Sequence, residues 1–163
     1  MRIRTIRSLA GLWAGVLALS SIGWAADMAN KKALTLAGAK KVAAEAEAEA
    51  VKNNWSVVIV VLDDGGHPIY LQRMDGTQLG SLEVATQKAR TALFFKRPSK
   101  AFEEGLTGGR QAILGIPGVL PVEGGVPLTV AGQIVGAIGV SGVTSQQDGQ
   151  IARAGAEEAT KLE

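Results

Sequence analysis

The sequence predicts an α+β domain, in which helices pack on an antiparallel sheet. Two stretches rich in β-branched and apolar residues, 55–74 and 126–142, are each divided by a short glycine-containing turn and therefore predict hairpins. Alanine-rich segments with apolar residues at helical spacing lie before, between and after them. Hairpins that are joined by helices form an antiparallel sheet, whose strand order the sequence leaves open.

The first expected element is a helix from Thr35 to about Lys52. Thr35 is a suitable N-cap, and "KKVAAEAEAEAVK" is dense in strong helix formers. One side carries Leu36 and four alanines, which are small enough to let the helix lie close to a sheet. Asn53 and Asn54 are expected to end the helix.

A hairpin follows. "WSVVIVVLDD" is apolar on both faces, as a central strand is, and "HPIYLQRM" is its expected partner. Asp64-Gly65-Gly66 suits a tight turn because glycine adopts positive φ. Pro68 lies near the start of the returning strand, where proline is tolerated.

A second helix is expected over 82–96, capped by Ser81 and stopped by Pro98. Ser99 is expected to begin a short helix. Residues 105–125 are rich in glycine and contain two prolines, which predicts a long ordered loop with a short helical turn near "RQAIL". Loops of this length inside a compact domain are usually functional.

The second hairpin pairs "VPLTV" with "QIVGAIGVSG" around the turn Ala131-Gly132. Glycines interrupt the longer strand, and a glycine in a strand often marks close approach of a helix or a ligand. A helix started by Ser145 is expected to close the chain.

The chain begins with a predicted signal peptide, residues 1–25. A basic start with three arginines and no acid is followed by an apolar run that ends in small residues. An uncleaved membrane anchor is the alternative, but the unbroken apolar stretch is shorter than the ~20 residues of a spanning helix. Residues 26–33 are a polar spacer. We therefore expect a periplasmic or secreted protein without stable membrane insertion after cleavage.

Charge and composition exclude several function classes. The whole chain has 17 basic and 15 acidic residues, so removal of the three leader arginines leaves 14 against 15. Nucleic-acid binding is not expected, since it needs a basic face. The chain has no cysteine and one histidine, which excludes thiol catalysis, cysteine zinc sites and multi-histidine metal sites. No nucleophile–base pair is visible, and the sequence assigns no catalytic residue.

Four segments in order carry a family resemblance: "VVLDDGGHPIYLQRMDG", "KARTALFF", "PVEGGVPL" and "GQIVGAIGVSG" with "QQDGQIARAG". Together they resemble the GlcG/HbpS-like family, also called the haem-degrading domain family, which is related to the PduO C-terminal domain. The resemblance implies one domain over 34–163 with a profilin/PAS-like fold, a central antiparallel sheet of about five strands flanked by helices. It also implies homo-oligomers, often octamers, and haem binding in some members.

If haem binds, His67 is the expected iron ligand. It is the only imidazole in the chain, and imidazole is a common protein ligand of haem iron. Tyr70 and Met74 are the other possible axial groups, although a half-buried core position is expected for Tyr70. The alternative for His67 is a solvated polar residue at the corner of a hairpin. The sequence thus predicts an exported haem-binding protein that helps to sense, buffer or degrade haem.

A second function stays open, namely binding of a small organic acid by an accessory or enzymatic domain. Arg73 has the planar group that pairs with a carboxylate or a haem propionate. Gly124 and Gly125 bring bare backbone amides to the start of a strand, and with Ser141 they suggest a small anion-binding concavity. The alternatives that involve no ligand are an ion pair or a turn cap for Arg73 and a structural Gly-Gly turn at Gly124 and Gly125.

Overall fold

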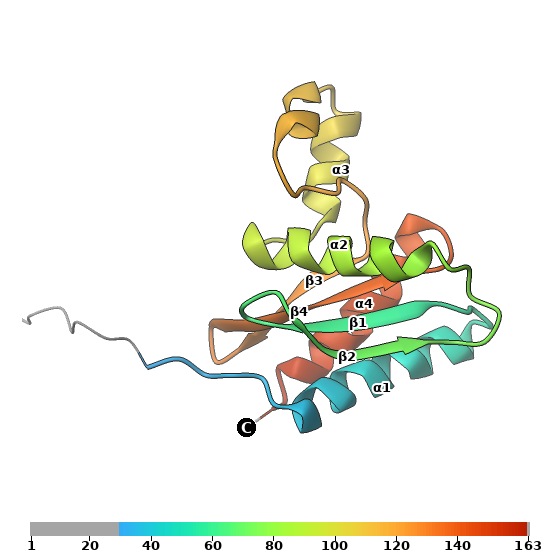
Figure 1. Ribbon diagram of the computed structural model, residues 1–163, viewed down its shortest axis with the longest axis vertical. Coiled ribbons are helices and arrows are strands. Elements are labelled where there is room, and N and C mark those ends of the chain that lie inside the picture. Colours follow the sequence, from blue (N-terminus) through green and yellow to red (C-terminus); the bar gives the residue numbers. More distant parts are fainter. Residues whose placement is uncertain (1–29, 163) are drawn as a thin grey trace, which may run out of the picture. The chain divides into compact units, whose positions relative to one another are not determined.

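The computed structural model describes residues 30–162. The predicted signal peptide and the first part of the spacer, up to residue 29, lie outside the described residues. The described chain forms an antiparallel sheet with helices on both faces, which confirms the α+β class (Figure 1). This sheet has four strands, where about five were expected. None of the helices in 30–162 is long and apolar enough to cross a membrane.

The elements follow the predicted order of helix, hairpin, helices, loop, hairpin and helix. In chain order they are α1 (Leu36–Lys52), β1 (Val58–Asp63), β2 (Pro68–Arg73), α2 (Ser81–Phe94), α3 (Lys100–Thr107), the short 3-10 helix η1 (Gln111–Gly115), β3 (Gly125–Val130), β4 (Gln133–Ser141) and α4 (Ser145–Ala159).

The strand order is β2-β1-β4-β3, so the two hairpins lie side by side and meet between β1 and β4. Val58 of β1 lies opposite Arg73 of β2 on one side and opposite Ser141 of β4 on the other. At the far edge, Gly125 of β3 lies opposite Gly139 of β4. β1 is buried along most of its length because it is an inner strand covered on both faces.

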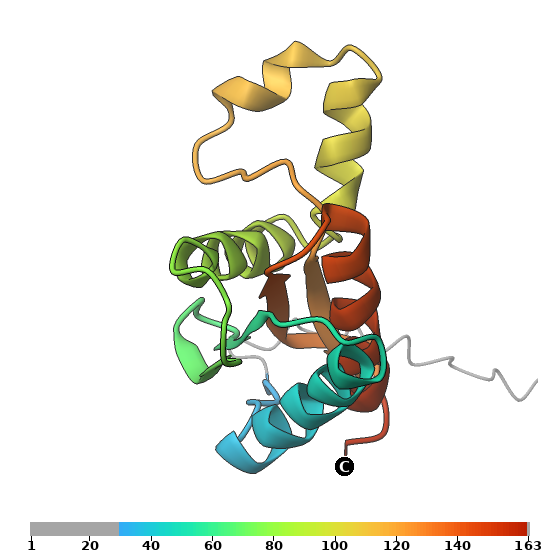
Figure 2. The ribbon, with the colours of Figure 1, turned by 90° about the vertical axis from the view of Figure 1, so that its right-hand side faces the viewer.

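Helices cover both faces of the sheet, as Figures 1 and 2 show. α1 and α4 pack against each other on one face, and α2 packs over β1, β3 and β4 on the other. Successive side chains of a strand point to opposite faces, so β1 supplies both cores. Alternate residues from Val57 to Val61 contact the α1/α4 layer, while the alternate set from Val58 to Leu62 contacts α2.

The predicted first helix is confirmed, with one change in its buried face. Thr35 is the N-cap, and its hydroxyl accepts a hydrogen bond from the Gly38 amide at 3.2 Å. The helix ends before Asn53, as expected. Leu36 is 49% exposed, however, and Val42 takes the large apolar position of the buried face.

Of the three serines expected at helix starts, Ser81 was wrong as a cap, whereas Ser99 and Ser145 begin their helices as expected. Gly80 precedes α2 as its N-cap, so Ser81 is the first helical residue. Ser145 is the first residue of α4, and Thr144 before it is the N-cap, in a reciprocal capping box with Gln147. Ser99 does precede α3, but its hydroxyl donates to the Val122 carbonyl instead of capping the helix.

Residues 98–124, which we call the arm, lead from α2 to β3. In Figures 1 and 2, α3 and η1 of the arm project away from the sheet beyond α2. Phe102 of α3 packs edge-on against Phe95, with ring centroids 5.2 Å apart. The returning chain is held by Thr91, whose hydroxyl accepts a hydrogen bond from the Leu120 amide at 2.9 Å. The short helical turn expected near "RQAIL" is η1, and the contact of the returning chain with α2 was not predicted.

Candidate functional site

The β1–β2 turn is organised by one carboxylate. Asp63 Oδ1 accepts hydrogen bonds from the Gly65 amide at 2.9 Å and from the His67 amide at 2.8 Å. The His67 amide, followed by that of Gly65, holds the pKa of Asp63 below its ordinary value. Gly66 adopts φ of +86°, which glycine accepts without strain. The turn therefore presents the next side chain in a fixed position.

That side chain is His67, and it is 80% exposed. Its Nδ1 lies 3.8 Å from Asp63 Oδ1, which is too long for a good hydrogen bond. The imidazole therefore packs into no core and is accessible to a ligand. The role of His67 as an iron ligand stays a prediction.

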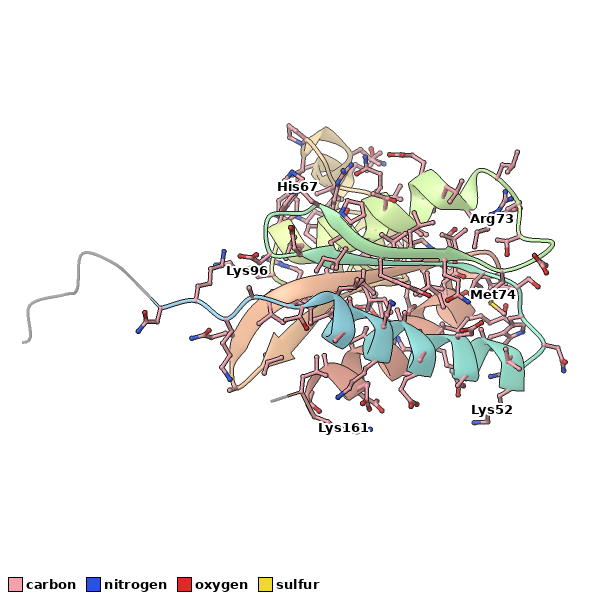
Figure 3. All side chains as sticks on the ribbon, turned by 60° about the horizontal axis from the view of Figure 1, so that its bottom comes forward. Lys52, His67, Arg73, Met74, Lys96 and Lys161 are labelled. Atoms are coloured by element: carbon pink, nitrogen blue, oxygen red, sulfur yellow. The ribbon has the colours of Figure 1, made fainter. Side chains whose placement is uncertain are left out.

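An aromatic ring and an arginine contact Gly66, the residue before this histidine. A Cβ atom added to Gly66 would lie 2.6 Å from Cζ of Phe94, so the ring rests directly on the turn. Phe94 is nevertheless 55% exposed. Arg90 Nε donates to the Gly66 carbonyl at 3.4 Å, and Figure 3 shows Lys96 at the same end of the molecule as His67. We call His67, Arg90, Phe94 and Lys96 the hairpin-tip site.

The other candidates on this hairpin point elsewhere. Tyr70 is half-buried against the α1/α4 core, as expected, and its hydroxyl donates to Gln72 Oε1 at 3.0 Å. Arg73 and Met74 lie at the opposite end of β2 from His67 (Figure 3). Six residues of strand separate His67 from Arg73, about 20 Å. No single ligand of haem size joins these two side chains within one chain.

Arg73 lines a shallow cleft of about 420 Å³ at that opposite end. The cleft is lined mainly by polar groups, including Asp75, Gln72 and Glu47, with Met74 as its one large apolar side chain. Gln72 Nε2 donates to Glu47 Oε1 at 2.6 Å. The cleft therefore offers one guanidinium and several acceptors, but no imidazole.

The structure does not bring Gly124 and Gly125 together with Arg73. Arg73 lies on one edge strand and Gly125 on the other, three strand spacings apart, which is at least about 14 Å. The Gly125 amide donates to Ser99 Oγ at 2.9 Å. Ser141 is 5% exposed, and its hydroxyl donates to Ser81 at 3.3 Å. An anion site built from these groups is not formed within the described chain.

Both glycines instead allow α2 to lie against the sheet. A Cβ atom at Gly125 would lie 2.0 Å from the Lys88 carbonyl oxygen, and one at Gly124 would lie 2.9 Å from Lys88 Nζ. Gly124 also has φ of +131°, a conformation that other residues avoid. The sequence predicted a close approach at the glycines of β4, where Gly139 does meet α2, but it did not predict one at Gly124 and Gly125.

Lys88 of α2 takes part in a buried ion pair. Its side chain is buried, and Nζ donates to Asp148 Oδ2 at 2.7 Å and to the Val140 carbonyl at 3.2 Å. Burial raises the pKa of Asp148 above its ordinary value, although the Lys88 ammonium opposes that rise. This ion pair joins α2, β4 and α4, and sequence spacing gave no signal for it.

Glu123 ties the arm to α4. Its carboxylate accepts hydrogen bonds from Arg153 at 2.6 Å and from Lys100 at 3.2 Å. Its amide donates to Glu103 Oε2 at 2.5 Å, and Glu103 also accepts from Ser145 at 3.0 Å. The hydrogen-bonding groups of these side chains are thus paired with one another, and their role is to hold the arm on α4.

In residues 30–162 no cluster of three histidine, aspartate or glutamate side chains is arranged to hold a metal ion.

Comparisons with known proteins show the family of this chain. The family model described as "Haem degrading protein HbpS-like" matches residues 34–157. Protein GlcG of Escherichia coli K12 is 45% identical over 114 residues, which cover 70% of this chain and 85% of GlcG. An uncharacterized 15.0 kDa protein of Citrobacter freundii is 34% identical over 120 residues, 71% of this chain and 84% of that protein.

Solved structures agree with the sequence comparison. The crystal structure of HbpS has a TM-score of 0.73 at 35% identity, over 80% of this chain and 93% of HbpS. The Klebsiella pneumoniae protein ORFY also has a TM-score of 0.73, at 29% identity, over 86% of this chain and 99% of that one. A PduOC–haem complex has a TM-score of 0.70 at 25% identity, over 78% and 95%. The chain therefore belongs to the GlcG/HbpS-like family.

Proposed function

We propose that this protein binds haem outside the cytoplasm and there helps to buffer it, sense it or deliver it for degradation. Membership of the HbpS-like haem-degrading family supports a haem-related function. The haem complex of the related PduOC supports haem as the ligand. The observation that carries the site is the exposed position of the chain's one imidazole at the hairpin tip, one residue after Gly66, against which the exposed ring of Phe94 rests.

The hairpin-tip site has the donor chemistry that haem needs. The imidazole of His67 supplies a nitrogen ligand to iron. The ring of Phe94 supplies a flat apolar surface for a macrocycle. Arg90 and Lys96 supply positive charge for two carboxylates, and Arg is suited to such pairing by its planar group. Bound haem would supply a redox-active, ligand-binding iron, which is the basis of sensing and of degradation.

Export is the part of the proposal that the leader supports. A basic start, an apolar run and a small-residue finish over residues 1–25 indicate a secretory signal. Intact mass of the protein recovered from its native host tests this proposal. A chain that begins at residue 26 or 27 supports it, and a chain that still carries residues 1–25 contradicts it.

Self-association completes the proposal. A haem on an exposed histidine has its second face in water unless another surface covers it. Large apolar side chains exposed in the single chain, among them Leu71, Leu79 and Leu114, support packing against further copies. Light scattering after size exclusion tests the claim, and a clean monomer at micromolar concentration contradicts it.

Titration with haemin, followed by absorbance, tests haem binding. We expect a saturable Soret shift in the wild-type protein and its loss in His67→Ala. Tyr70→Phe and Met74→Leu are matched controls, since each removes another possible axial group and keeps its size; both should retain the shift. An unchanged spectrum in His67→Ala would remove His67 from the site, and no shift in any form would contradict haem binding.

The organic-acid function draws less support from the geometry. Its two anchors, Arg73 and the Gly124-Gly125 turn, lie on opposite edges of the sheet, and the Gly125 amide already bonds Ser99. Nothing in the described chain joins them around one ligand, and we carry haem binding forward as the function to test.

A further inference from the structure

A second and larger hollow lies at the end of the α1/α4 layer where α1 begins and the chain leaves α4. It has a volume of about 630 Å³, within the range of small-molecule sites, which is roughly 300–1,000 Å³. Four segments wall it: the chain before α1, the first turns of α1, the end of the β3–β4 hairpin and the chain after α4. The amide of Lys32 donates to Gln133 Oε1 at 3.4 Å and so links the first wall to the third. We call this hollow the α1 groove.

The α1 groove combines apolar walls with a cationic rim. Leu34 packs against the α1/α4 core. Its Cδ1 would lie 3.0 Å from a Cβ atom added to Gly38, so Leu34 forms a wall of the groove beside α1. The apolar lining comprises Leu34, Val130, Val135 and Leu162, and the charged lining comprises Lys32, Lys41 and Lys161. A groove with this lining suits a molecule that is apolar along its length and anionic at one end.

The charges of the rim are only partly paired within residues 30–162. Lys161 pairs with Glu158 at 2.8 Å, and this carboxylate raises the pKa of Lys161. Lys32 and Lys41, by contrast, have no carboxylate within ion-pair distance in residues 30–162. Two of the three rim lysines are therefore without an ion-pair partner in the described chain, while Glu45 and Glu157 add to the negative charge near Lys161.

The direction of α1 adds to this positive potential. The groove lies at the N-terminal end of a 17-residue helix, the positive end of its dipole. No acidic residue occupies the first turn of α1, where aspartate or glutamate is usually favourable. Thr35 caps only the Gly38 amide through its side chain. The N-terminus of α1 and the lysines of the rim thus both attract a negatively charged group.

We propose that the α1 groove binds an anionic amphiphile, specifically a carboxylate carried on an unbranched apolar chain. The carboxylate lies between Lys32 and Lys41, and the apolar chain lies against the leucine and valine lining. A neutral apolar molecule would leave the lysines unused, and an inorganic anion would leave the apolar lining in water. This inference is independent of haem binding at the hairpin tip, because it uses none of the same residues.

Isothermal titration of the purified protein with dodecanoate, kept below its micelle concentration, tests the proposal. We expect one saturable site, and about tenfold weaker binding in Lys41→Glu as a charge-assisted contact is lost. Lys40→Glu is the matched control, since Lys40 is exposed on the same helix but does not line the groove. It should retain most of the affinity. Dodecyltrimethylammonium, with the same tail and opposite charge, should bind at least tenfold more weakly.

Three outcomes of these titrations would overturn the proposal, and a fourth comes from competition with haemin. They are no saturable heat with dodecanoate, equal loss of affinity in Lys40→Glu and Lys41→Glu, or equal binding of the cationic amphiphile. His67→Ala should bind dodecanoate like the wild type, and Lys41→Glu should give the wild-type haemin titration. A failure at one site is thereby distinguished from a failure at the other. Displacement of dodecanoate by haemin would also overturn it, by showing that the groove takes haem.

Discussion

Asp63 is the residue on which the geometry of the hairpin tip depends. Its carboxylate accepts two backbone amides of the turn, and the chain thereby positions His67 without burying it. Sequence reasoning recognised the glycines of this turn but not the carboxylate before them. Aspartate is common at turns, and whether its oxygen reaches the amide two or four residues later depends on the turn formed.

We expect Asp63→Asn to destabilise the fold in a pH-dependent way. The pKa of Asp63 is lowered from 3.8, so the folded state releases the proton more readily than the unfolded state. The stability that this ionised group contributes is complete above pH 3.8 and is lost as the pH falls through the lower folded value. Urea unfolding at several pH values checks this. The difference between wild type and variant should be largest near neutrality and shrink in acid; a difference that is constant with pH would contradict it.

The Lys88–Asp148 pair gives a second prediction at this scale. Lys88→Met leaves a buried carboxylate without its counter-ion and should cost about 3–5 kcal/mol of unfolding free energy. Asp148→Asn alone should also be costly, because it leaves a buried ammonium unpaired. The double variant should recover much of the loss. Chemical denaturation of all four proteins measures the coupling, and strictly additive losses would show that the pair does not act as a unit.

At the scale of elements, glycines decide how closely α2 approaches the sheet. A Cβ atom would lie 2.0 Å from the Lys88 carbonyl oxygen at Gly125 and 2.0 Å from the Ala85 carbonyl oxygen at Gly139. Both obstacles are backbone atoms of a packed helix, which cannot move by rotating a side chain. The tight packing of α2 on β3 and β4 therefore requires glycine at these two positions.

Gly125→Ala should consequently destabilise the protein by about 3 kcal/mol or more, since the whole of α2 must shift to admit one methyl group. Gly115→Ala is the matched control, because a Cβ atom at Gly115 meets nothing within 4 Å. The control should change the unfolding free energy by at most about 0.5 kcal/mol. Thermal and urea unfolding of both variants measure the effect, and equal stabilities would contradict this account of the packing.

The sequence predicted elements well and long-range contacts poorly. α1 and both hairpins follow from local patterns, namely helix formers after Thr35 and glycine turns between apolar runs. The burial of Lys88 could not be predicted, because it depends on Asp148, which is 60 residues away along the chain. The exposure of His67 was expected, but the ring of Phe94 against the neighbouring Gly66 was not, since Phe94 reaches the turn only when α2 packs on the sheet.

At the scale of the whole molecule, α2 covers one face of the sheet only in part, which suggests where the chains of the proposed oligomer would pack. α2 lies over β1, β3 and β4, and on the edge strand β2 Leu71 is 46% exposed. Phe94, at the end of α2, is 55% exposed next to the hairpin tip. The proposed haem ligand therefore lies at a partly apolar edge, and a second chain that covers this edge would also exclude water from the haem.

Haem binding and self-association should then depend on each other, which gives the last prediction. Each chain has one imidazole, so a six-coordinate iron with two imidazole ligands needs His67 from two chains. We expect a haemin titration at high protein concentration to end at about one haem per two chains with a low-spin spectrum. On dilution the low-spin fraction should fall, because ligand binding stabilises the assembly by mass action. Absorbance titrations over a hundredfold range of protein concentration measure both effects. A low-spin spectrum that ends at one haem per chain and does not change on dilution would contradict a haem shared between chains.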